Sequence, residues 1–227
     1  MPFPDLPDRL RDVREKIDLA ARRGGHGQTV TIVAVTKTHG ADAVQAAWDA
    51  GLPDVGENRI QEAMPKIDAT SVPVRWHLIG HLQRNKAKAV ARFHLLHSLD
   101  SGRLADAIHE IGIAEGRPID ALVQVNVVGE DTKGGIDRAS WESEAERLRG
   151  LSGIRVRGVM TMAPLDADET VLRTVFSGAR DARDVLRAAG HQATELSMGM
   201  SNDYEIAVEE GATLVRLGTI LFGARPA

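Results

Sequence analysis

The stretch that decides the fold runs from Thr29 to Gly40 and reads TVTIVAVTKTHG. The β-branched apolar residues at positions 30, 32, 33 and 35 are typical of a buried strand. The run ends at Lys37, after which the chain turns into a helix that begins near Ala41. The pattern therefore predicts a core strand with a lysine at its carboxyl-terminal end.

Two interpretations of Lys37 are open from this stretch alone. In the first, the side chain extends into solvent where the strand finishes. In the second, an amine that is partly shielded from water has a lowered pKa and attacks a carbonyl to form a Schiff base. The residues at the ends of the other strands decide between them.

The composition narrows the class of protein. The chain has 227 residues, which is within the range where an α/β barrel is one domain, and we expect residues 1–227 to form a single domain. A net charge of −4 gives no global field that favours nucleic acid or an anionic membrane. The absence of cysteine excludes disulfides, thiolate metal sites and cysteine nucleophiles. No apolar leader or spanning run is seen, so the sequence predicts a soluble, cytoplasmic protein.

Apolar strands and amphipathic helices alternate along the whole chain. The predicted strands cover residues 30–35, 53–56, 74–79, 93–99, 119–128, 154–160, 193–196 and 213–217. Helices are predicted between them, and a further one over 5–23 precedes the first strand. Eight such units favour a single (β/α)8 TIM-type barrel, in which the N-terminal helix fills the place of a missing last helix. The alternative is an open doubly wound sheet, but no G-x-G-x-x-G follows the first strand.

Glycine and hydroxyl residues follow the last two strands. SMGMSND, residues 197–203, contains Ser201, and RLGTILFG, residues 216–223, contains Gly218 and Thr219. Each loop alone is equally well explained as an ordinary helix start. Together they favour a phosphate site, since barrels often bind phosphate after strands seven and eight.

Arg216 is a charge within the apolar strand TLVRLGT. It must either point outward among the helices or reach the site, where a buried guanidinium requires an acceptor. A lysine for an aldehyde, a phosphate cradle and an arginine for a ring nitrogen together describe a site for pyridoxal phosphate (PLP).

Several motifs, in order along most of the chain, resemble those of the pyridoxal-phosphate homeostasis proteins. They are AVTKTHG, GENRIQE, WHLIGHLQRNK, VNVVGEDTKGGI, LSMGMSNDYEIAVEEGATLVRLGT and the closing FG. That family is similar in fold to the N-terminal barrel domain of alanine racemase. The resemblance implies Lys37 as the Schiff-base lysine, Ser201, Gly218 and Thr219 at the phosphate and Arg216 at the pyridine nitrogen. It also implies that Asn58 and His77 line the pocket.

The chemistry favours a PLP carrier over an enzyme, so we assign no catalytic residues. An arginine beside the ring nitrogen disfavours its protonation and weakens the cofactor as an electron sink. Tyr204, the only tyrosine, is beside the phosphate loop and not on a second domain. The family resemblance implies PLP homeostasis, delivery to apo-enzymes and balance of amino and keto acids. The alternatives are a weak racemase or decarboxylase, with Lys37 and His77 as acid–base groups, and a phosphate-binding barrel without pyridoxal.

Other conspicuous residues have simpler explanations. His77 and His81 lack a third ligand, so no metal site is expected. The basic face of Arg84, Lys86, Lys88 and Arg92 is best explained as a solvated helix surface, without nucleic-acid binding. Lys133 is a candidate second amine at the pocket rim during cofactor hand-over. We expect a monomer, because the chain lacks the second domain that contributes a dimer surface in racemases.

Overall fold

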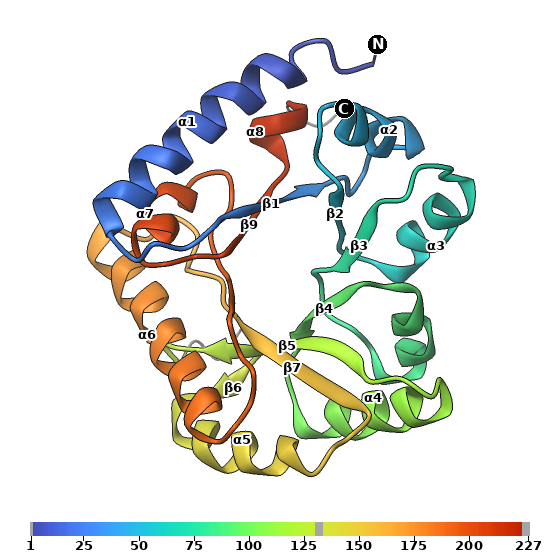
Figure 1. Cartoon of the computed structure of the whole chain (residues 1–227), viewed down its shortest axis with the longest axis vertical. Helices are drawn as coiled ribbons and strands as arrows, with labels where there is room; N and C mark the ends of the chain where they lie inside the picture. Colours follow the sequence, from blue (N-terminus) through green and yellow to red (C-terminus); the bar gives the residue numbers. More distant parts are fainter. Residues whose placement is uncertain (1, 130–133, 224–227) are drawn as a thin grey trace.

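Eight parallel strands close into a barrel (Figure 1). The computed structural model describes residues 2–129 and 134–223. Each strand pairs with its neighbours in chain order, and the barrel is closed by pairing of β1 with β9 and of β4 with β5. The strands are β1 (Thr31–Val35), β2 (Asp54–Glu57), β3 (Arg75–Leu78), β4 (Leu95–Leu99), β5 (Ile119–Asn126), β7 (Ile154–Met160), β8 (Glu195–Ser197) and β9 (Leu214–Leu217). The predicted (β/α)8 barrel is therefore confirmed.

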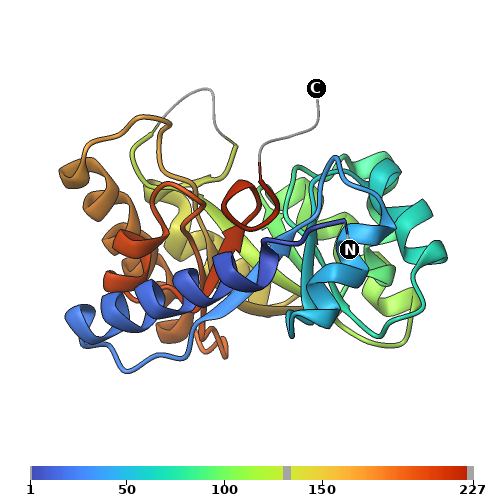
Figure 2. The same cartoon turned by 90° about the horizontal axis from the view of Figure 1, so that it is seen from above.

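Helices surround the barrel and connect successive strands (Figures 1 and 2). They are α1 (Leu6–Gly24), α2 (Ala41–Asp49), α3 (Ile60–Ala69), η1 (Arg84–Arg92), α4 (Gly102–Ala114), η2 (Arg138–Ser140), α5 (Trp141–Arg149), α6 (Glu169–Ala188), α7 (Tyr204–Glu209) and α8 (Thr219–Phe222). This leaves the loops after the strand carboxyl ends to form the mouth of the barrel, as in other barrels of this type.

The alternation of side chains along each strand separates two apolar layers. Residues two apart on a strand point to the same side. Inside the barrel, one residue from each of five strands forms a small apolar cluster, namely Val33, Leu95, Leu122, Met160 and Leu214. The intervening residues, such as Ile32 and Ala34 on β1, point outward and pack with the helices in the larger core.

The N-terminal helix α1 packs against α7 and α8, beside the strands β1 and β9 (Figure 1). Its buried stripe is Leu6, Leu10, Val13, Ile17 and Ala20, the set expected from the helical spacing. Because α8 spans only four residues, the much longer α1 covers the part of the barrel that a last helix would occupy. The predicted role of the N-terminal helix is thus confirmed.

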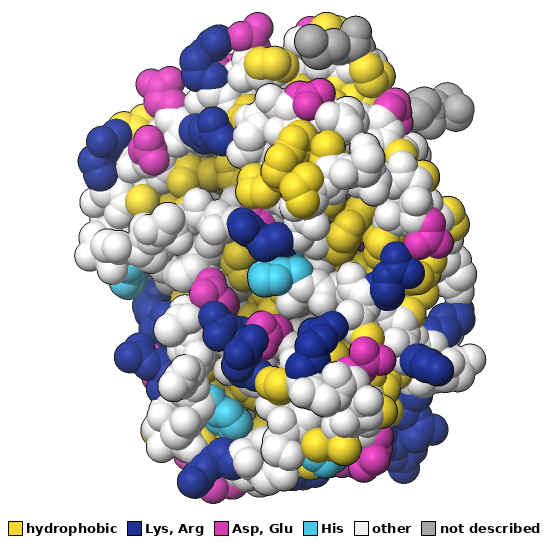
Figure 3. Space-filling model, turned by 45° about the vertical axis from the view of Figure 1, so that its right-hand side comes forward, with side chains coloured by type: hydrophobic (Ala, Val, Ile, Leu, Met, Phe, Trp, Pro, Cys, Tyr) yellow, Lys and Arg dark blue, Asp and Glu magenta, His cyan; other side chains and the backbone are white. Residues whose placement is uncertain are grey.

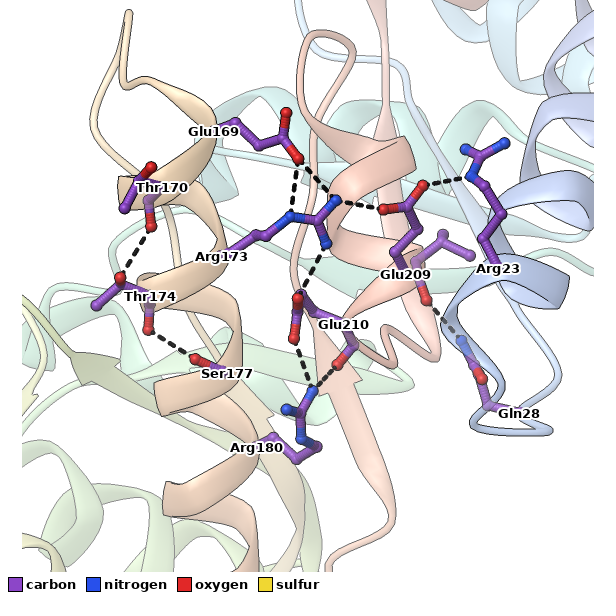
Figure 4. Close-up of polar contacts among 11 residues, drawn as sticks. Arg23, Gln28, Glu169, Thr170, Arg173, Thr174, Ser177, Arg180, Glu209 and Glu210 are labelled. Atoms are coloured by element: carbon purple, nitrogen blue, oxygen red, sulfur yellow. Dashed lines mark hydrogen bonds and ion pairs between the residues drawn. The ribbon is translucent and has the colours of Figure 1, made fainter.

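A network of charged side chains ties α1, α6 and α7 together (Figure 4). Glu209 accepts hydrogen bonds from Arg23 on α1 at 2.6 Å and from Arg173 on α6 at 2.6 Å. Arg173 also contacts Glu210, which in turn accepts from Arg180. Ion pairs that share partners in this way are worth more than isolated surface pairs.

Three local features differ from the sequence prediction. Residues Arg84–Arg92 form a 3-10 helix whose buried residues, Ala87 and Val90, are three apart, which is the repeat of that helix. The charged residues spaced by four are exposed, as expected for a solvated surface. The two-residue strand β6 (Ile136–Asp137), paired with β5, and the short helix α8 were not predicted, because neither has enough residues to show a periodic pattern.

The surface carries a mixture of charges. On the face shown in Figure 3, basic side chains are interspersed with acidic and apolar ones. Within residues 2–129 and 134–223, no helix is both long enough and apolar enough to cross a membrane.

Candidate functional site

The carboxyl end of β1 leads into a tight turn that contains Lys37. Thr36 is fully buried, Lys37 is half-buried, and Thr38 has a φ of 69°, a left-handed conformation that a β-branched residue rarely adopts. The turn is closed by a hydrogen bond from the His39 amide to the Thr36 carbonyl at 3.1 Å. Strain of this kind is found mainly where the surrounding structure enforces it, often at functional sites.

An ion pair beneath this turn supplies that enforcement. The Lys66 ammonium on α3 donates to the Thr36 carbonyl at 2.8 Å and to Oε1 of Glu57 at 2.7 Å. The Thr36 hydroxyl donates to the same carboxylate oxygen at 2.6 Å. Glu57 is fully buried and Lys66 nearly so. The backbone that carries Lys37 is therefore held to β2 and α3 by charged hydrogen bonds in a low-dielectric environment.

Asn58 follows β2 at the same end of the barrel and is half-buried. Its backbone lies directly against Gly80, which follows β3: a Cβ on Gly80 would lie 2.2 Å from the Asn58 carbonyl oxygen. A residue without a side chain is therefore required at position 80. This contact explains the glycine in the motif WHLIGHLQRNK and holds the two loops of the mouth together.

The predicted phosphate residues come together at the ends of β8 and β9. The Ile220 amide at the start of α8 points to the Ser201 hydroxyl oxygen at 3.4 Å. Gly218 precedes α8, and a Cβ there would make ordinary contact with Val35 of β1 at 3.4 Å. Gly199 has a φ of 90°, and a Cβ there would lie 2.6 Å from Ala207. The structure therefore brings Ser201, Gly218 and Thr219 into one corner, next to the strand that leads to Lys37.

Arg216 points into the barrel and is 4% exposed. Its Nη1 donates to the Ser197 carbonyl at 2.8 Å and to the Ser197 hydroxyl at 2.7 Å, and its Nη2 donates to the Thr161 carbonyl at 3.0 Å. Burial lowers the pKa of Arg216 to about 10, an effect that the carboxylate of Asp203 partly offsets. The side chain remains a cation at neutral pH, and these contacts use at most three of the five N–H groups of a guanidinium.

His77 is placed differently from the expectation that it lines the pocket. It is 2% exposed, and both of its ring nitrogens contact protein groups within the barrel. Nε2 lies 2.9 Å from Oδ1 of Asp54, and Nδ1 lies 2.8 Å from Nε2 of His97. Asp54 is at the amino-terminal end of β2, so this contact directs His77 away from the mouth. The structure therefore gives no support to His77 as an acid–base group for a ligand.

The remaining predicted residues are less central. His81, which follows β3, contacts Asp100 through Nδ1 at 2.8 Å, so it and His77 have separate partners. Within the described residues there is no group of three side chains suited to a metal ion. Lys133 lies outside the described residues.

Sequence reasoning missed the groups that support the site from behind. From the sequence, no role was assigned to Glu57, Lys66, His97, Thr161 or Ser197. Two of them, Glu57 and Ser197, lie within the motifs that carry the family resemblance. The available signal was a polar residue at a strand position where alternation requires burial. His97 in the strand LLHSL and Glu57 at the end of DVGE both fit that description.

The donor set suits a small molecule that bears a carbonyl and a phosphate. A lysine on a fixed turn offers an amine, the corner after β8 and β9 offers a hydroxyl and helix-start amides, and Arg216 offers cationic N–H donors. A PLP molecule has one group for each of these, so the residues present fit that cofactor.

Sequence comparisons identify relatives over the full length of the chain. Residues 9–226 match the family model described as alanine racemase, N-terminal domain. A protein of Aquifex aeolicus named pyridoxal phosphate homeostasis protein is 39% identical over 222 residues, 96% of this chain and 97% of the relative. The protein of the same name from Escherichia coli K12 is 37% identical over 230 residues, 97% of each chain.

Solved structures agree with this assignment. The structure of PipY from Synechococcus elongatus with PLP bound has a TM-score of 0.85 and 36% identity, covering 96% of this chain and all of that one. Alanine racemase from Corynebacterium glutamicum has a TM-score of 0.71 at 19% identity, covering 93% of this chain and 60% of the racemase, and shows likeness of fold alone. The chain thus belongs to the alanine racemase N-terminal domain family and, within it, to the pyridoxal phosphate homeostasis proteins.

Proposed function

We propose that this protein binds PLP at the mouth of its barrel and acts in PLP homeostasis. The names of its relatives and the PLP-bound PipY structure support the cofactor. The observation that carries the proposal is the buried guanidinium of Arg216. Arg216 lies on β9, which pairs on one side with the strand that leads to Lys37 and on the other with the strand that leads to Ser201. Its contacts with Ser197 and Thr161 use at most three of its five N–H groups, so the guanidinium can also donate to an acceptor on a ligand.

Each group of the ligand has a partner in this proposal. Lys37 would condense with the aldehyde to a Schiff base with release of water, and the rigid turn around it limits the positions of the amine. Ser201, Gly218 and Thr219 hold the phosphate through a hydroxyl and backbone amides. Arg216 donates to the pyridine nitrogen, and Asn58 lines the pocket. Bound PLP supplies an electrophilic carbonyl carbon and, in enzymes, an electron sink.

The residues favour holding and release of the cofactor over catalysis. A cationic donor at the ring nitrogen opposes protonation there, which weakens the electron sink. Tyr204 is buried, and burial with the nearby Glu205 carboxylate raises its pKa to about 12. Its hydroxyl is therefore a poor acid–base group near neutral pH. In this proposal the protein keeps free PLP low, transfers it to apo-enzymes as transient acceptors, and so influences the balance of amino and keto acids.

The test is an absorbance spectrum of the purified protein with PLP, before and after borohydride, followed by peptide mapping. We expect a visible Schiff-base band, and a pyridoxyl group on Lys37 after reduction. Lys37→Ala should lose both, whereas the exposed Lys88→Ala should retain them. A modified lysine other than Lys37, or a colourless protein, would refute the proposal.

A second assay addresses catalysis. Wild-type protein loaded with PLP is incubated with D- and L-amino acids, and racemisation and decarboxylation are followed. We expect no turnover above that of free PLP. Turnover that disappears in Lys37→Ala would instead favour the weak racemase or decarboxylase.

A further inference from the structure

A continuous row of polar side chains crosses the inside of the barrel from its mouth to its opposite face. Arg216 Nη1 contacts Ser197 Oγ at 2.7 Å, Ser197 Oγ contacts His97 Nδ1 at 2.8 Å, and His97 Nε2 contacts His77 Nδ1 at 2.8 Å. The row continues from His77 Nε2 to Oδ1 of Asp54 at 2.9 Å. We call these five side chains the polar row.

The row ends at the face opposite the mouth. Asp54 is the first residue of β2, and Arg75, the first residue of β3, donates from Nε to its Oδ1 at 2.6 Å. Half of the Arg75 side chain is exposed. Ser197, by contrast, is the last residue of β8. The charged pair of Asp54 and Arg75, at the face opposite the mouth, is therefore connected to Arg216 by side-chain hydrogen bonds alone.

Burial makes this arrangement costly for the fold. All five members are at most 4% exposed, and the barrel interior also contains the apolar cluster of Val33, Leu95, Leu122, Met160 and Leu214. Buried ionic groups are often replaceable by apolar residues with no loss of stability. A polar interior therefore points to a role for the row beyond holding the barrel together.

The direction of each hydrogen bond follows from the charges. Burial would raise the pKa of Asp54, but the hydrogen bonds from His77 and Arg75 outweigh it and lower the value to about 2. Asp54 is thus a carboxylate, which only accepts, and His77 must donate from Nε2. Burial and the neighbouring His77 and Arg216 hold the pKa of His97 well below its usual value, so His97 is neutral.

Neutral His97 permits two arrangements. With His77 neutral, its Nδ1 accepts from His97 Nε2–H, and His97 Nδ1 accepts from the Ser197 hydroxyl. Ser197 Oγ then accepts from Arg216, and every bond points from Arg216 toward Asp54. With His77 cationic, the His97 tautomer reverses and Ser197 Oγ receives two donors. The first arrangement leaves the hydroxyl hydrogen paired and adds no cation beside His94, Arg75 and Arg216, which favours it.

We propose that the polar row positions Arg216 for the ring nitrogen of the cofactor, with Asp54 as its fixed end and Ser197 as the contact that orients the guanidinium. This rests on the proposed function, because it assumes PLP as the ligand. Asp54, His77, His97 and Ser197 are positioning residues that do not touch the ligand. They fix both histidine tautomers and the position of the Ser197 hydroxyl, and the contact of that hydroxyl with Nη1 limits which N–H groups of Arg216 remain for the mouth.

The first test reads the tautomers directly in the protein without PLP. Long-range ¹⁵N–¹H spectra of protein labelled with ¹⁵N-histidine should show both His77 and His97 as Nε2–H tautomers at neutral pH. Asp54→Asn should change the spectrum of His77 and also of His97, which Asp54 does not contact. A His97 that carries its proton on Nδ1, or is unaffected by Asp54→Asn, would overturn the proposal.

The second test measures PLP affinity by titration of the visible band. Asp54→Asn and Ser197→Ala should each weaken binding about 5- to 30-fold and shift the pH dependence of the band. Asp120→Asn is the matched control: Asp120 pairs with Arg155 across two neighbouring strands at the same end of the barrel but lies outside the row. The PLP affinity of Asp120→Asn should stay within twofold of wild type.

The outcomes separate this proposal from the proposed function. Wild-type affinity in both row variants would overturn the positioning role while leaving PLP binding intact. Failure of the wild-type protein to bind PLP would overturn both. If Asp54→Asn does not fold, Ser197→Ala tests the other end of the row, and the wild-type tautomers remain decisive.

Discussion

The ammonium of Lys66 lies 2.7 Å from Oε1 of Glu57, inside the protein and directly beneath the turn that carries Lys37. Among the described residues, the second carboxylate oxygen of Glu57 has no hydrogen-bond partner. Loss of the lysine would therefore leave a buried carboxylate without its counter-charge. Such losses are far more costly than replacing both partners.

We expect Lys66→Met to lower the free energy of unfolding by about 3 kcal/mol and to weaken PLP binding, because the Thr36 carbonyl also loses its donor. The control, Lys88→Met, alters an exposed lysine and should change stability by less than about 0.5 kcal/mol. Urea unfolding of both variants provides the measurement. Equal stability of the two variants would show that the buried pair does not support the turn.

Gly80→Ala should separate the two loops of the mouth. The new Cβ would lie 2.2 Å from the Asn58 carbonyl, so one loop must move, at a cost of about 2–3 kcal/mol. Gly150→Ala is the control, because its Cβ would meet no atom closer than 3.5 Å at an ordinary helical φ of −74°. We expect weaker PLP binding only in Gly80→Ala. Unfolding and PLP titration check both parts.

Stability should decline on mild acidification because of His97. Burial holds its pKa well below the unfolded value of about 6.5, so below that pH the unfolded chain binds a proton that the folded chain does not. This contribution is complete above the unfolded pKa and is lost as pH falls, by up to about 1.4 kcal/mol per pH unit. Asp54 adds a second loss between pH of about 4, its unfolded pKa, and about 2.

Urea unfolding at a series of pH values measures this decline. The exposed His26→Gln should keep the slope between pH 6.5 and 5.5, whereas His97→Gln should reduce it. An identical slope in wild type and His97→Gln would assign the proton uptake to other groups.

Arg173→Met should weaken the attachment of α7 to α6, because this residue contacts Glu169, Glu209 and Glu210 together. We expect a loss of about 1 kcal/mol that shrinks in high salt, since the side chains are partly exposed. Arg11→Met, which breaks one exposed pair with Asp8, should cost no more than a few tenths of a kcal/mol. Urea midpoints at low and high salt distinguish the network from a single pair.

Periodicity was sufficient to predict the barrel. Strands such as 154–160 and helices such as α6 carry long, regular patterns, and each of the eight barrel strands begins within a few residues of its predicted start. The 3-10 geometry of η1 was not predictable from charges spaced by four, because a spacing of four is typical of an α-helix. Short elements such as α8 depend on their neighbours and have little signal of their own.

The site was predictable where its residues follow a strand end or interrupt an apolar strand with a charge. Lys37 and the loops of Ser201 and Gly218 are of the first kind, and Arg216, inside β9, is of the second. His77 also lies near the carboxyl end of its strand, yet its partner Asp54 lies at the opposite end of the barrel. The pairing of His97 with Ser197 joins residues 100 positions apart, which no local pattern reveals.

The position of α1 has a consequence for the order in which the protein can fold during synthesis. Its apolar face packs on elements that begin at Tyr204, and β1 pairs with β9, from Thr31 to Leu214. The apolar face of α1 is therefore covered mainly by segments that are synthesised much later than α1 itself. We infer that closure of the barrel is a late step in folding, because it joins residues far apart in the sequence, and that the face of Leu6, Leu10 and Val13 is a natural binding site for a chaperone until then.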